Sequence, residues 1–417
     1  MSKIRLHGTS SGYTEIAPVA ASGNNTLTLP NDGTIISKDA AGAVGVTSVH
    51  TTNITATGIA TITTAKIGAG VTISESGIEA SGIGITVANI NGTQIGGKRN
   101  LIINGAMHIA QRGSSSTSTG YGSVDRFAIS ASGQDEAPTA AQVDVSSGTT
   151  PYTLGFRKSY KITNGNQTSG AGDLYRIYQF IEAQNIATSG WNYTSTSSDI
   201  TVSCWVKSSV AQNFYIEFRT QDGTQKAYVW ETGSLTADTW TKVIKTIPGD
   251  SGISFNNDTG HGACIFFHLF NGTDTTTSSH TLNQWAAYNT SSRTPDFTST
   301  WYTTNDATFE LTGVQIEIGS QATPFEHLNF TEELKLCQRY YQVGSSIGAS
   351  YGRSNGYARG GSVYATQMRS TPTLSTTNSG SGSIIASGTS NTGFYVTYGS
   401  LGASSAGIFS FIAESEL

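Results

Sequence analysis

Two groups of aromatic and charged residues have the side chains that proteins use to bind sugars. Sugars present flat C–H faces that stack on Trp and Tyr rings, and their hydroxyl groups pair with Arg, Asn and Asp. The first group lies in a Gly-rich stretch with no hydrophobic period: Tyr351, Arg353, Tyr357 and Arg359. The second group lies in or beside a long predicted loop, Asn271–Thr304: Trp285, Tyr288 and Tyr302. We predict ligand contacts at both groups, although either could instead pack against a neighbouring subunit.

The carboxylates favour structural roles over catalysis. Hydrolysis of a polysaccharide usually takes two carboxyl groups about 5–10 Å apart. Asp125 stands beside Arg126, which indicates an internal ion pair. Glu310 and Glu317 fall on the polar side of a predicted strand. The sequence therefore predicts a protein that is not an enzyme.

Metal and cofactor sites have equally little support. His261 and His268 lie on either side of Cys264, but their spacing would send them to opposite faces of a strand. Asn and Asp residues near position 257 could offer oxygen ligands, yet turn formation explains them better than a calcium loop does. Nucleotide-binding loops and the nucleophile elbow of hydrolases are missing from the sequence. We expect no cofactor, and spacing does not support a structural calcium ion.

The composition favours an all-β protein that acts outside the cell. Charged residues make up only 12% of the 417 residues, while Gly contributes 48, which suits short strands joined by turns. A net charge of −5 provides no electrostatic footprint for nucleic acid. No apolar run approaches the length of a membrane span, so we expect no membrane insertion. Three widely spaced cysteines, Cys204, Cys264 and Cys337, argue against a disulfide framework and for folding in a reducing cytoplasm.

Four parts are expected along the chain. Residues 1–40 form a Gly- and Asn-rich leader that is too small to fold alone. Residues 41–98 are nearly repetitive, with single aliphatic residues every few positions and Gly at the corners, so one chain cannot bury its apolar edge. Three parallel copies could bury it around a common axis, although a flexible linker is the alternative. Residues 99–342 contain short two-faced strands, and residues 343–417 form a last small β domain.

Strands and a helix can be placed within the central part. Asp199–Ser209 alternates so that Cys204 falls on one face of a strand and Trp205 on the other. Phe309–Ile318 also alternates, and the proline that follows ends the hydrogen-bond ladder. A short amphipathic helix then places Cys337 on its buried side, where a packing role is favoured over a catalytic one.

The end of this central part resembles a segment found near the end of many tailed-bacteriophage tail fibres. The matching residues, in order, are Thr312–Gly319, Ala322–His327, Glu333-Leu334 and Cys337–Tyr341. Asn100–Gly113 and Tyr121–Phe127 resemble the opening of a β-sandwich domain that is widespread in phage fibres, and the strands after them resemble jelly-roll carbohydrate-binding modules. The leader resembles the N-terminal segment of many fibre and baseplate-associated proteins.

The resemblance implies an all-β homotrimer with a trimeric fibrous stalk, a jelly-roll β-sandwich and a small C-terminal β domain. The N-terminus would dock on a phage tail or baseplate protein, and the C-terminal receptor-binding tip would recognise host surface glycans without chemistry. The protein would be made in the host cytoplasm and reside in the virion. A polysaccharide depolymerase tailspike and a purely structural virion fibre protein are the alternatives.

Overall fold

The computed structural model describes residues 4–7, 13–16, 64–67, 71–74, 77–80, 99–351, 357–399, 401 and 407–417. The chain separates into two compact units, residues 1–85 and 86–417. In the first unit, β1 (Ile4–His7) pairs antiparallel with β2 (Tyr13–Ile16). A second antiparallel sheet joins β3 (Thr64–Ile67), β4 (Val71–Ser74) and β5 (Gly77–Ala80). The rest of the predicted leader and stalk lies outside the described residues.

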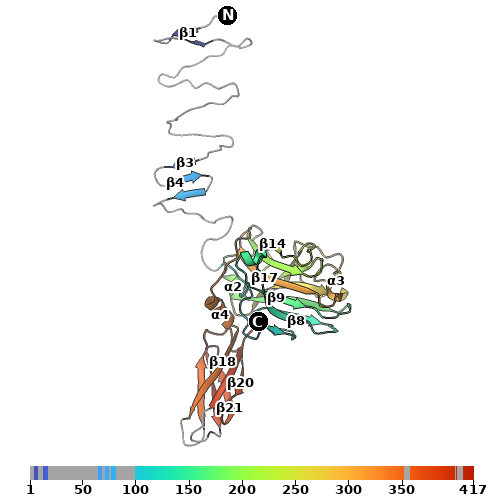
Figure 1. The fold of residues 1–417 in the computed structure, drawn as a ribbon, viewed down its shortest axis with the longest axis vertical. Coiled ribbons are helices and arrows are strands. Elements are labelled where there is room, and N and C mark those ends of the chain that lie inside the picture. Colours follow the sequence, from blue (N-terminus) through green and yellow to red (C-terminus); the bar gives the residue numbers. More distant parts are fainter. Residues whose placement is uncertain are drawn as a thin grey trace. The chain divides into compact units, whose positions relative to one another are not determined.

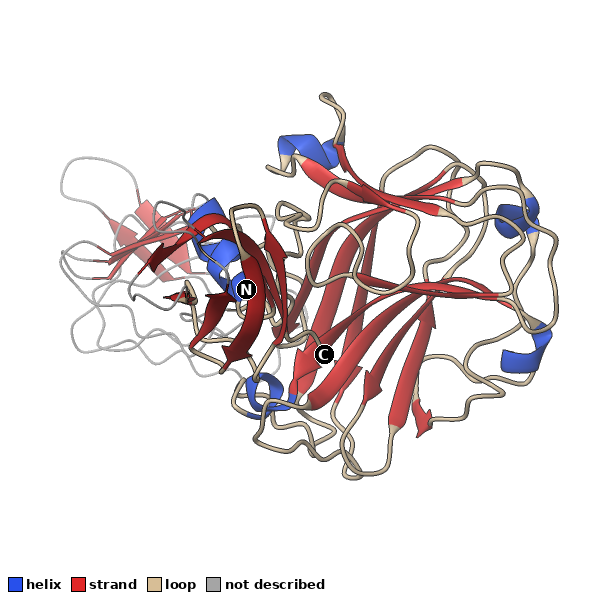
Figure 2. Cartoon of the chain, turned by 90° about the horizontal axis from the view of Figure 1, so that it is seen from below, coloured by secondary structure: helices blue, strands red, loops and turns tan. Residues whose placement is uncertain are grey.

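The body of the second unit is a sandwich of two six-stranded antiparallel sheets. The first sheet has the order β16 (Trp285–Ala287), β13 (Lys226–Glu231), β12 (Tyr215–Thr220), β15 (His261–Asn271), β10 (Leu174–Glu182) and β7 (Ala128–Ser132). The second has the order β14 (Thr241–Pro248), β11 (Asp199–Ser208), β17 (Thr308–Ile318), β9 (Lys158–Thr163), β8 (Thr139–Asp144) and β6 (Ser115–Ser116). Figure 2 shows the two sheets as separate layers. The predicted jelly-roll-like β-sandwich is therefore confirmed at the level of an antiparallel double sheet.

The core lies between these sheets because alternate residues of each strand point inward. On β11, Val202, Cys204 and Val206 are buried in the core, while Trp205 faces outward, as the sequence predicted. Three short helices, α1 (Thr150–Thr153), α2 (Ala183–Ala187) and α3 (Thr300–Thr303), and a 3₁₀ turn, η1 (Thr273–Thr275), lie in the connections.

A bulge interrupts β17 where the alternation of its inward residues changes phase. Ser203 of β11 pairs with Gln315, but Trp205 pairs with Thr312, so the register shifts at this point. Gly313 sits in the bulge with a φ of 63°, a conformation that costs glycine little and other residues more. The extra residue explains how Leu311 and Val314, three positions apart, both reach the core.

Helix α4 (Phe330–Gln338) closes the sandwich and leads into the C-terminal domain. The side chain of Asn329 caps it by accepting a hydrogen bond from the Glu332 backbone N–H at 3.0 Å. Cys337 and Tyr340 are buried under the helix, which confirms the predicted packing face. Burial raises the pKa of the Cys337 thiol, and a thiol held neutral in this way suits packing rather than nucleophilic chemistry.

The C-terminal domain is a single curled sheet with its own core. Its order is β20 (Thr373–Asn378), β23 (Gly407–Glu414), β18 (Tyr341–Tyr351), β19 (Ala358–Val363), β22 (Gly393–Gly399) and β21 (Ser383–Thr389). Aromatic residues, including Phe394, Tyr398 and Phe409, fill the inside of this sheet. Figure 1 shows the domain in orange and red. The region predicted as a small C-terminal β domain thus forms a sheet of its own within the second unit.

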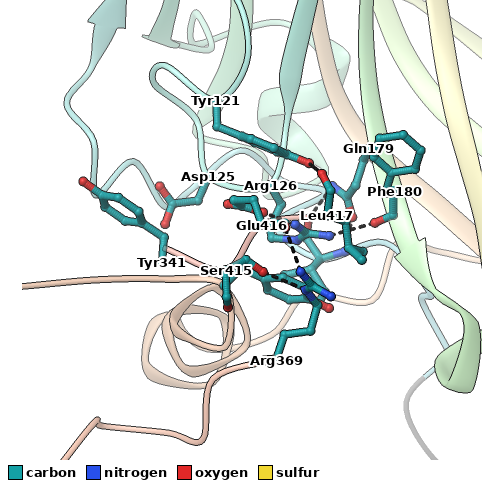
Figure 3. Close-up of polar contacts among 12 residues, drawn as sticks. Tyr121, Asp125, Arg126, Gln179, Phe180, Tyr341, Arg369, Ser415, Glu416 and Leu417 are labelled. Atoms are coloured by element: carbon teal, nitrogen blue, oxygen red, sulfur yellow. Dashed lines mark hydrogen bonds and ion pairs between the residues drawn. The ribbon is translucent and has the colours of Figure 1, made fainter. Parts of the chain in front are cut away.

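Buried polar contacts join the C-terminal domain to the sandwich (Figure 3). Arg126 forms an ion pair with Glu416, donates to the Phe180 carbonyl at 2.7 Å and stacks over the Tyr340 ring at 3.5 Å. Tyr121 donates its hydroxyl to the Leu417 carbonyl at 3.0 Å. The predicted pair between neighbouring Asp125 and Arg126 is wrong, because Asp125 instead accepts hydrogen bonds from the backbone and side chain of Gln111.

Candidate functional site

A pocket of about 340 Å³ opens on the outer face of the second sheet. Ligand sites in proteins are commonly concave, largely apolar and supplied with a few polar groups. The lining residues are Leu154, Phe156, Ser203, Trp205, Lys242, Gly313, Ala322, Thr323, Pro324, Phe325 and His327. They come from β11, β14, the β17 bulge and the two segments that follow α1 and β17. We refer to this feature as the Trp205 pocket.

Trp205 supplies the largest aromatic surface of the pocket. It is only part-buried, because the alternation of β11 sends it out of the core. Its indole N–H donates to no residue in the described part of the chain, so it can donate to a ligand hydroxyl. A part-exposed indole with a free N–H suits a sugar, which offers both an apolar face and polar edges.

The floor of the pocket depends on Gly313. A Cβ atom at this position would lie 2.7 Å from Cζ of Phe156 and 3.2 Å from Cδ1 of Trp205. Only glycine satisfies both this spacing and the positive φ of the bulge. The bulge therefore brings the β17 backbone close beneath the two aromatic rings.

The segment Ala322–His327 forms the outer wall and is tied down at several points. Glu326 accepts hydrogen bonds from the backbone N–H groups of Arg99 and Asn100 at 2.9 and 2.8 Å. The backbone N–H of Thr323 donates to Glu317 at 2.9 Å. These contacts give the Ala322–His327 motif a physical role, since they fold the chain back over the sheet and hold the wall in place.

Aromatic contacts order the inside of this wall. Phe325 meets Phe156 edge-on with ring centroids 4.9 Å apart, and His327 lies 4.9 Å from Phe325. His327 donates Nε2–H to the Leu154 carbonyl at 2.9 Å. The wall thus presents a preformed aromatic surface opposite Trp205, and preformed surfaces lose little entropy on binding.

Positive charge dominates the surroundings of the pocket. Lys242 lines it and is exposed. Burial lowers the pKa of nearby His108, and the charges of His327, Arg157 and Lys158 lower it further. The lining includes no Asp or Glu side chain, so the pocket lacks the pair of carboxyl groups that glycoside hydrolysis usually takes.

The predicted ligand residues in Asn271–Thr304 have separate environments. Trp285 is part-buried, and its indole donates to the Pro248 carbonyl at 2.7 Å, so it packs the edge of the first sheet. Tyr288 is also part-buried and lies under the guanidinium of Arg219, 4.0 Å from its ring centroid. Tyr302 is 0% exposed and stacks on Phe270. Burial leaves Tyr302 no surface for a ligand, which corrects that part of the prediction.

The predicted ligand residues near position 355 lie in the C-terminal domain. Tyr351 ends β18, and Arg353 lies outside the described residues. Tyr357 is 51% exposed. Arg359 is exposed and stacks over Tyr395 with its guanidinium 4.7 Å from the ring centroid. The stretch has no hydrophobic period in the sequence, yet Ala358–Val363 forms β19 and pairs with β22, so Arg359 extends from a strand.

A bulge also corrects the predicted placement of His261 and His268. Ile181 pairs with Ala263 while Glu182 pairs with His261, so Gly262 is the extra residue of β15. This shift turns His261 to the outer face of the sheet, where its ring stacks on that of Phe180 with centroids 4.2 Å apart. His268 lies on the same face. Sequence spacing could not reveal the bulge. The described residues hold no cluster of three potential metal ligands.

The sequence pattern placed Trp205 on the strand face opposite Cys204 but did not reveal the pocket. Two neighbouring motifs could have revealed the pocket. The motif on β17 contains the bulge glycine, and the motif Ala322–His327 contains the aromatic residues that fold back beside it. No helix in the described part of the chain is long and apolar enough to cross a membrane.

No protein-family model matches the chain, and no curated protein matches it. Among solved structures, a domain of tailspike protein 4 from bacteriophage CBA120 is 11% identical with a TM-score of 0.28, covering 52% of this chain and 21% of the tailspike chain. The carbohydrate-binding module CBM4 is 12% identical with a TM-score of 0.26, covering 52% and 97% of the two chains. A family 11 carbohydrate-binding module from Clostridium thermocellum is 11% identical with a TM-score of 0.22, covering 48% and 91%. At these scores the likenesses carry no argument about function.

Proposed function

We propose that the chain is a tail-fibre subunit that attaches a tailed phage to its host by binding cell-surface glycans without cutting them. The observation that carries the proposal is the Trp205 pocket, which combines aromatic walls, a free indole N–H and a lysine with no carboxyl group in its lining. The wall of this pocket is built by the motifs that resemble tail-fibre segments. Their order and spacing support the assignment to a phage fibre.

The remaining parts of the proposal follow from the sequence. The N-terminal leader docks on a tail or baseplate protein, residues 41–98 associate as a homotrimeric stalk, and the finished fibre belongs to the virion. Threefold display raises the avidity of individually weak glycan sites. The Trp205 pocket is therefore the primary glycan site, while Tyr357 and Arg359 form a second exposed surface in the C-terminal domain.

Binding of full-length protein to immobilised host envelope polysaccharide tests the proposal. We expect Trp205→Ala to weaken binding by about tenfold or more, since loss of a sugar-stacking ring removes on the order of 1–3 kcal/mol. Trp240→Ala is the matched control because Trp240 is also part-buried and directly precedes β14, the edge strand of the same sheet, but does not line the pocket. Equal binding by the wild type and both variants would refute the pocket as the glycan site.

Two further arms separate the alternatives. Release of reducing ends from the polysaccharide during incubation would favour a depolymerase over a binding protein. The Tyr357→Ala, Arg359→Ala double variant tests the C-terminal surface: if it abolishes binding while Trp205→Ala does not, the C-terminal domain is the receptor site. A protein that fails to bind envelope polysaccharide at all would support a purely structural fibre protein.

A further inference from the structure

The outer face of the first sheet carries a cluster of arginines far from the Trp205 pocket. Arg176 comes from β10, Arg219 from β12, and Arg293 from the segment that follows β16. Inward neighbours of the same strands, such as Ile177 and Phe218, pack in the core, so the arginines point away from it. The Trp205 pocket opens on the second sheet, which places the two features on opposite faces of the sandwich.

Aromatic rings hold the guanidinium groups in fixed positions. The ring of Phe266 lies between two of them, with Arg176 4.5 Å and Arg219 4.2 Å from its centroid. Arg219 also lies over Tyr288 at 4.0 Å, and Arg293 donates its Nε–H to the Tyr288 hydroxyl at 3.2 Å. Stacked guanidinium groups keep their N–H edges free for other partners.

The charge of the cluster is poorly balanced by the protein. Among the described residues, Glu217 is the one carboxylate in an ion pair with this cluster, 3.4 Å from Nε of Arg219, and its charge also acts on Arg176. Three guanidinium charges against one carboxylate leave an excess of two positive charges. Burial lowers the pKa of Arg176, and the like charges of Arg293 and Arg219 add to this effect. A partly buried site with this excess attracts an anion.

Several donors of the cluster also have no acceptor. Among the residues that the structure describes, Nε and Nη1 of Arg176 are buried without a hydrogen-bond partner, whereas Nε of Arg219 has Oε1 of Glu217 as its ion-pair partner at 3.4 Å. Buried donors without partners are uncommon in proteins, and a bound ion is one of the things that can satisfy them. Arg176 and Arg293 are only part-buried, so their remaining edges are accessible from solvent.

From this arrangement we infer a second binding site on the sandwich that takes an anionic sugar, one bearing a carboxylate or a phosphate group. Arg176 and Arg293 would donate hydrogen bonds to the anionic group, while Tyr178 and Tyr288, both part-buried on the same face, would contact the sugar ring. The inference is independent of the Trp205 pocket, which lies on the other sheet. It predicts that the sandwich binds acidic glycans more tightly than neutral glycans of the same shape.

Titration calorimetry of the full-length protein with trigalacturonate and its fully methyl-esterified form tests this site. The two probes share their sugar rings, so only the carboxylates differ. We expect the acid to bind and the ester to bind at least about tenfold more weakly, with an affinity for the acid that falls as salt rises. Glucose 6-phosphate, a phosphorylated sugar, tests whether a phosphate group can take the place of the carboxylate at this site. Equal binding of acid and ester would overturn the inference.

Variants assign the binding to the cluster. Arg176→Gln and Arg293→Gln should each weaken trigalacturonate binding by about tenfold, because each removes a charge-assisted donor. Arg157→Gln is the matched control, since Arg157 is exposed and stacks on Tyr152 at 4.0 Å away from the cluster. An equal loss in Arg157→Gln would show non-specific charge attraction and overturn the site. Tighter binding of a single-stranded oligonucleotide than of the acidic sugar would also overturn the proposed sugar site.

Failure of this site and of the proposed function can be told apart. Trp205→Ala should leave trigalacturonate binding unchanged, whereas Arg176→Gln should leave any neutral-glycan binding at the Trp205 pocket unchanged. Loss of trigalacturonate binding in Trp205→Ala, with Arg176→Gln unaffected, would assign the anion to the pocket and contradict the inference. Thermal melts of each variant confirm that the comparison is made on folded protein.

Discussion

At the residue scale, glycine at position 313 links the fold to the candidate site. Its positive φ creates the bulge that keeps Leu311 and Val314 in the core, and its missing side chain lets Phe156 and Trp205 approach the β17 backbone. A single residue thus satisfies two requirements, one of backbone conformation and one of packing. This explains why the Thr312–Gly319 motif includes a glycine inside a strand.

We expect Gly313→Ala to destabilise the protein and distort the Trp205 pocket. The positive φ costs an alanine roughly 1–2 kcal/mol, and the clash with Phe156 adds about 1–3 kcal/mol. Gly233→Ala is the control, because Gly233 has a φ of 73° and nothing within 4 Å of its Cβ position. Chemical denaturation measures both. A free energy of unfolding lowered equally in the two variants would mean that the clash has no cost.

The buried pair of Glu217 and His268 makes the stability depend on pH. Burial lowers the pKa of His268, even though the hydrogen bond to Glu217 at 2.8 Å opposes that effect. Burial alone would raise the pKa of Glu217, but the His268 hydrogen bond and the nearby Arg219 and Arg176 charges outweigh it, so this pKa is lowered. Nδ1 of His268 accepts from Asn271 at 3.1 Å, which fits a neutral imidazole beside an ionised carboxylate.

Acidification from pH 7.5 to 5 should therefore lower the melting temperature. The pKa of His268 is lower in the folded protein than its ordinary 6.5, so the unfolded chain binds more protons in this range and gains stability relative to the folded one as pH falls. His268→Gln keeps a donor for Glu217 but cannot titrate, so its melting temperature should fall less over the same range. Parallel curves for the two proteins would contradict this role, since His108 and His261 remain in both.

At the element scale, residues distant in sequence join the sandwich and the C-terminal domain. Arg126 follows the opening loop of the sandwich, Tyr340 follows α4, and Glu416 follows β23, yet the three side chains meet in one buried cluster. Arg112 adds a second ion pair to Glu416 at 3.0 Å. The two domains are therefore expected to unfold together.

Arg126→Met tests this coupling. It leaves the Glu416 carboxylate with less compensation in a buried site, and removing one partner of a buried ion pair typically costs about 3–5 kcal/mol. We expect calorimetry to show a lower melting temperature and a separate transition for the C-terminal domain. Adding Glu416→Gln should restore part of the loss. Arg157→Met, at an exposed arginine, should leave the single transition unchanged, and the same result for Arg126→Met would argue against coupling by this cluster.

Sequence patterns predicted the elements better than the site. The strand within Asp199–Ser209 was placed correctly because its two-residue alternation survives in the sheet. The bulges at Gly262 and Gly313 escaped prediction because one inserted residue breaks that alternation without leaving a periodic signal. The pocket and the arginine cluster escaped for another reason: their residues come from strands that meet only in the folded sheets.

At the scale of the whole molecule, apolar surface remains without a partner. In the C-terminal domain Val363 is 80% exposed and Ile385 is 55% exposed, and Ile412 and Val343, which pair across β23 and β18, are also exposed. Surface of this kind commonly marks a protein interface. The sequence of residues 41–98 repeats single aliphatic residues, which we predict that one chain cannot bury by itself. Both features are consistent with association of several copies along the chain.

The proposed homotrimer therefore has a direct test. In multi-angle light scattering at micromolar concentration, we expect a mass three times the 43.7 kDa of one chain. Replacing Ile73 and Ile78, which pair across β4 and β5, by Asn should weaken the trimer, because burial of each aliphatic side chain stabilises by roughly 1.5–3 kcal/mol and each change is repeated in three copies. Thr72→Asn on the same strand is the control. A monomeric wild-type protein under these conditions would exclude the trimer, and avidity could then no longer compensate for weak individual glycan sites.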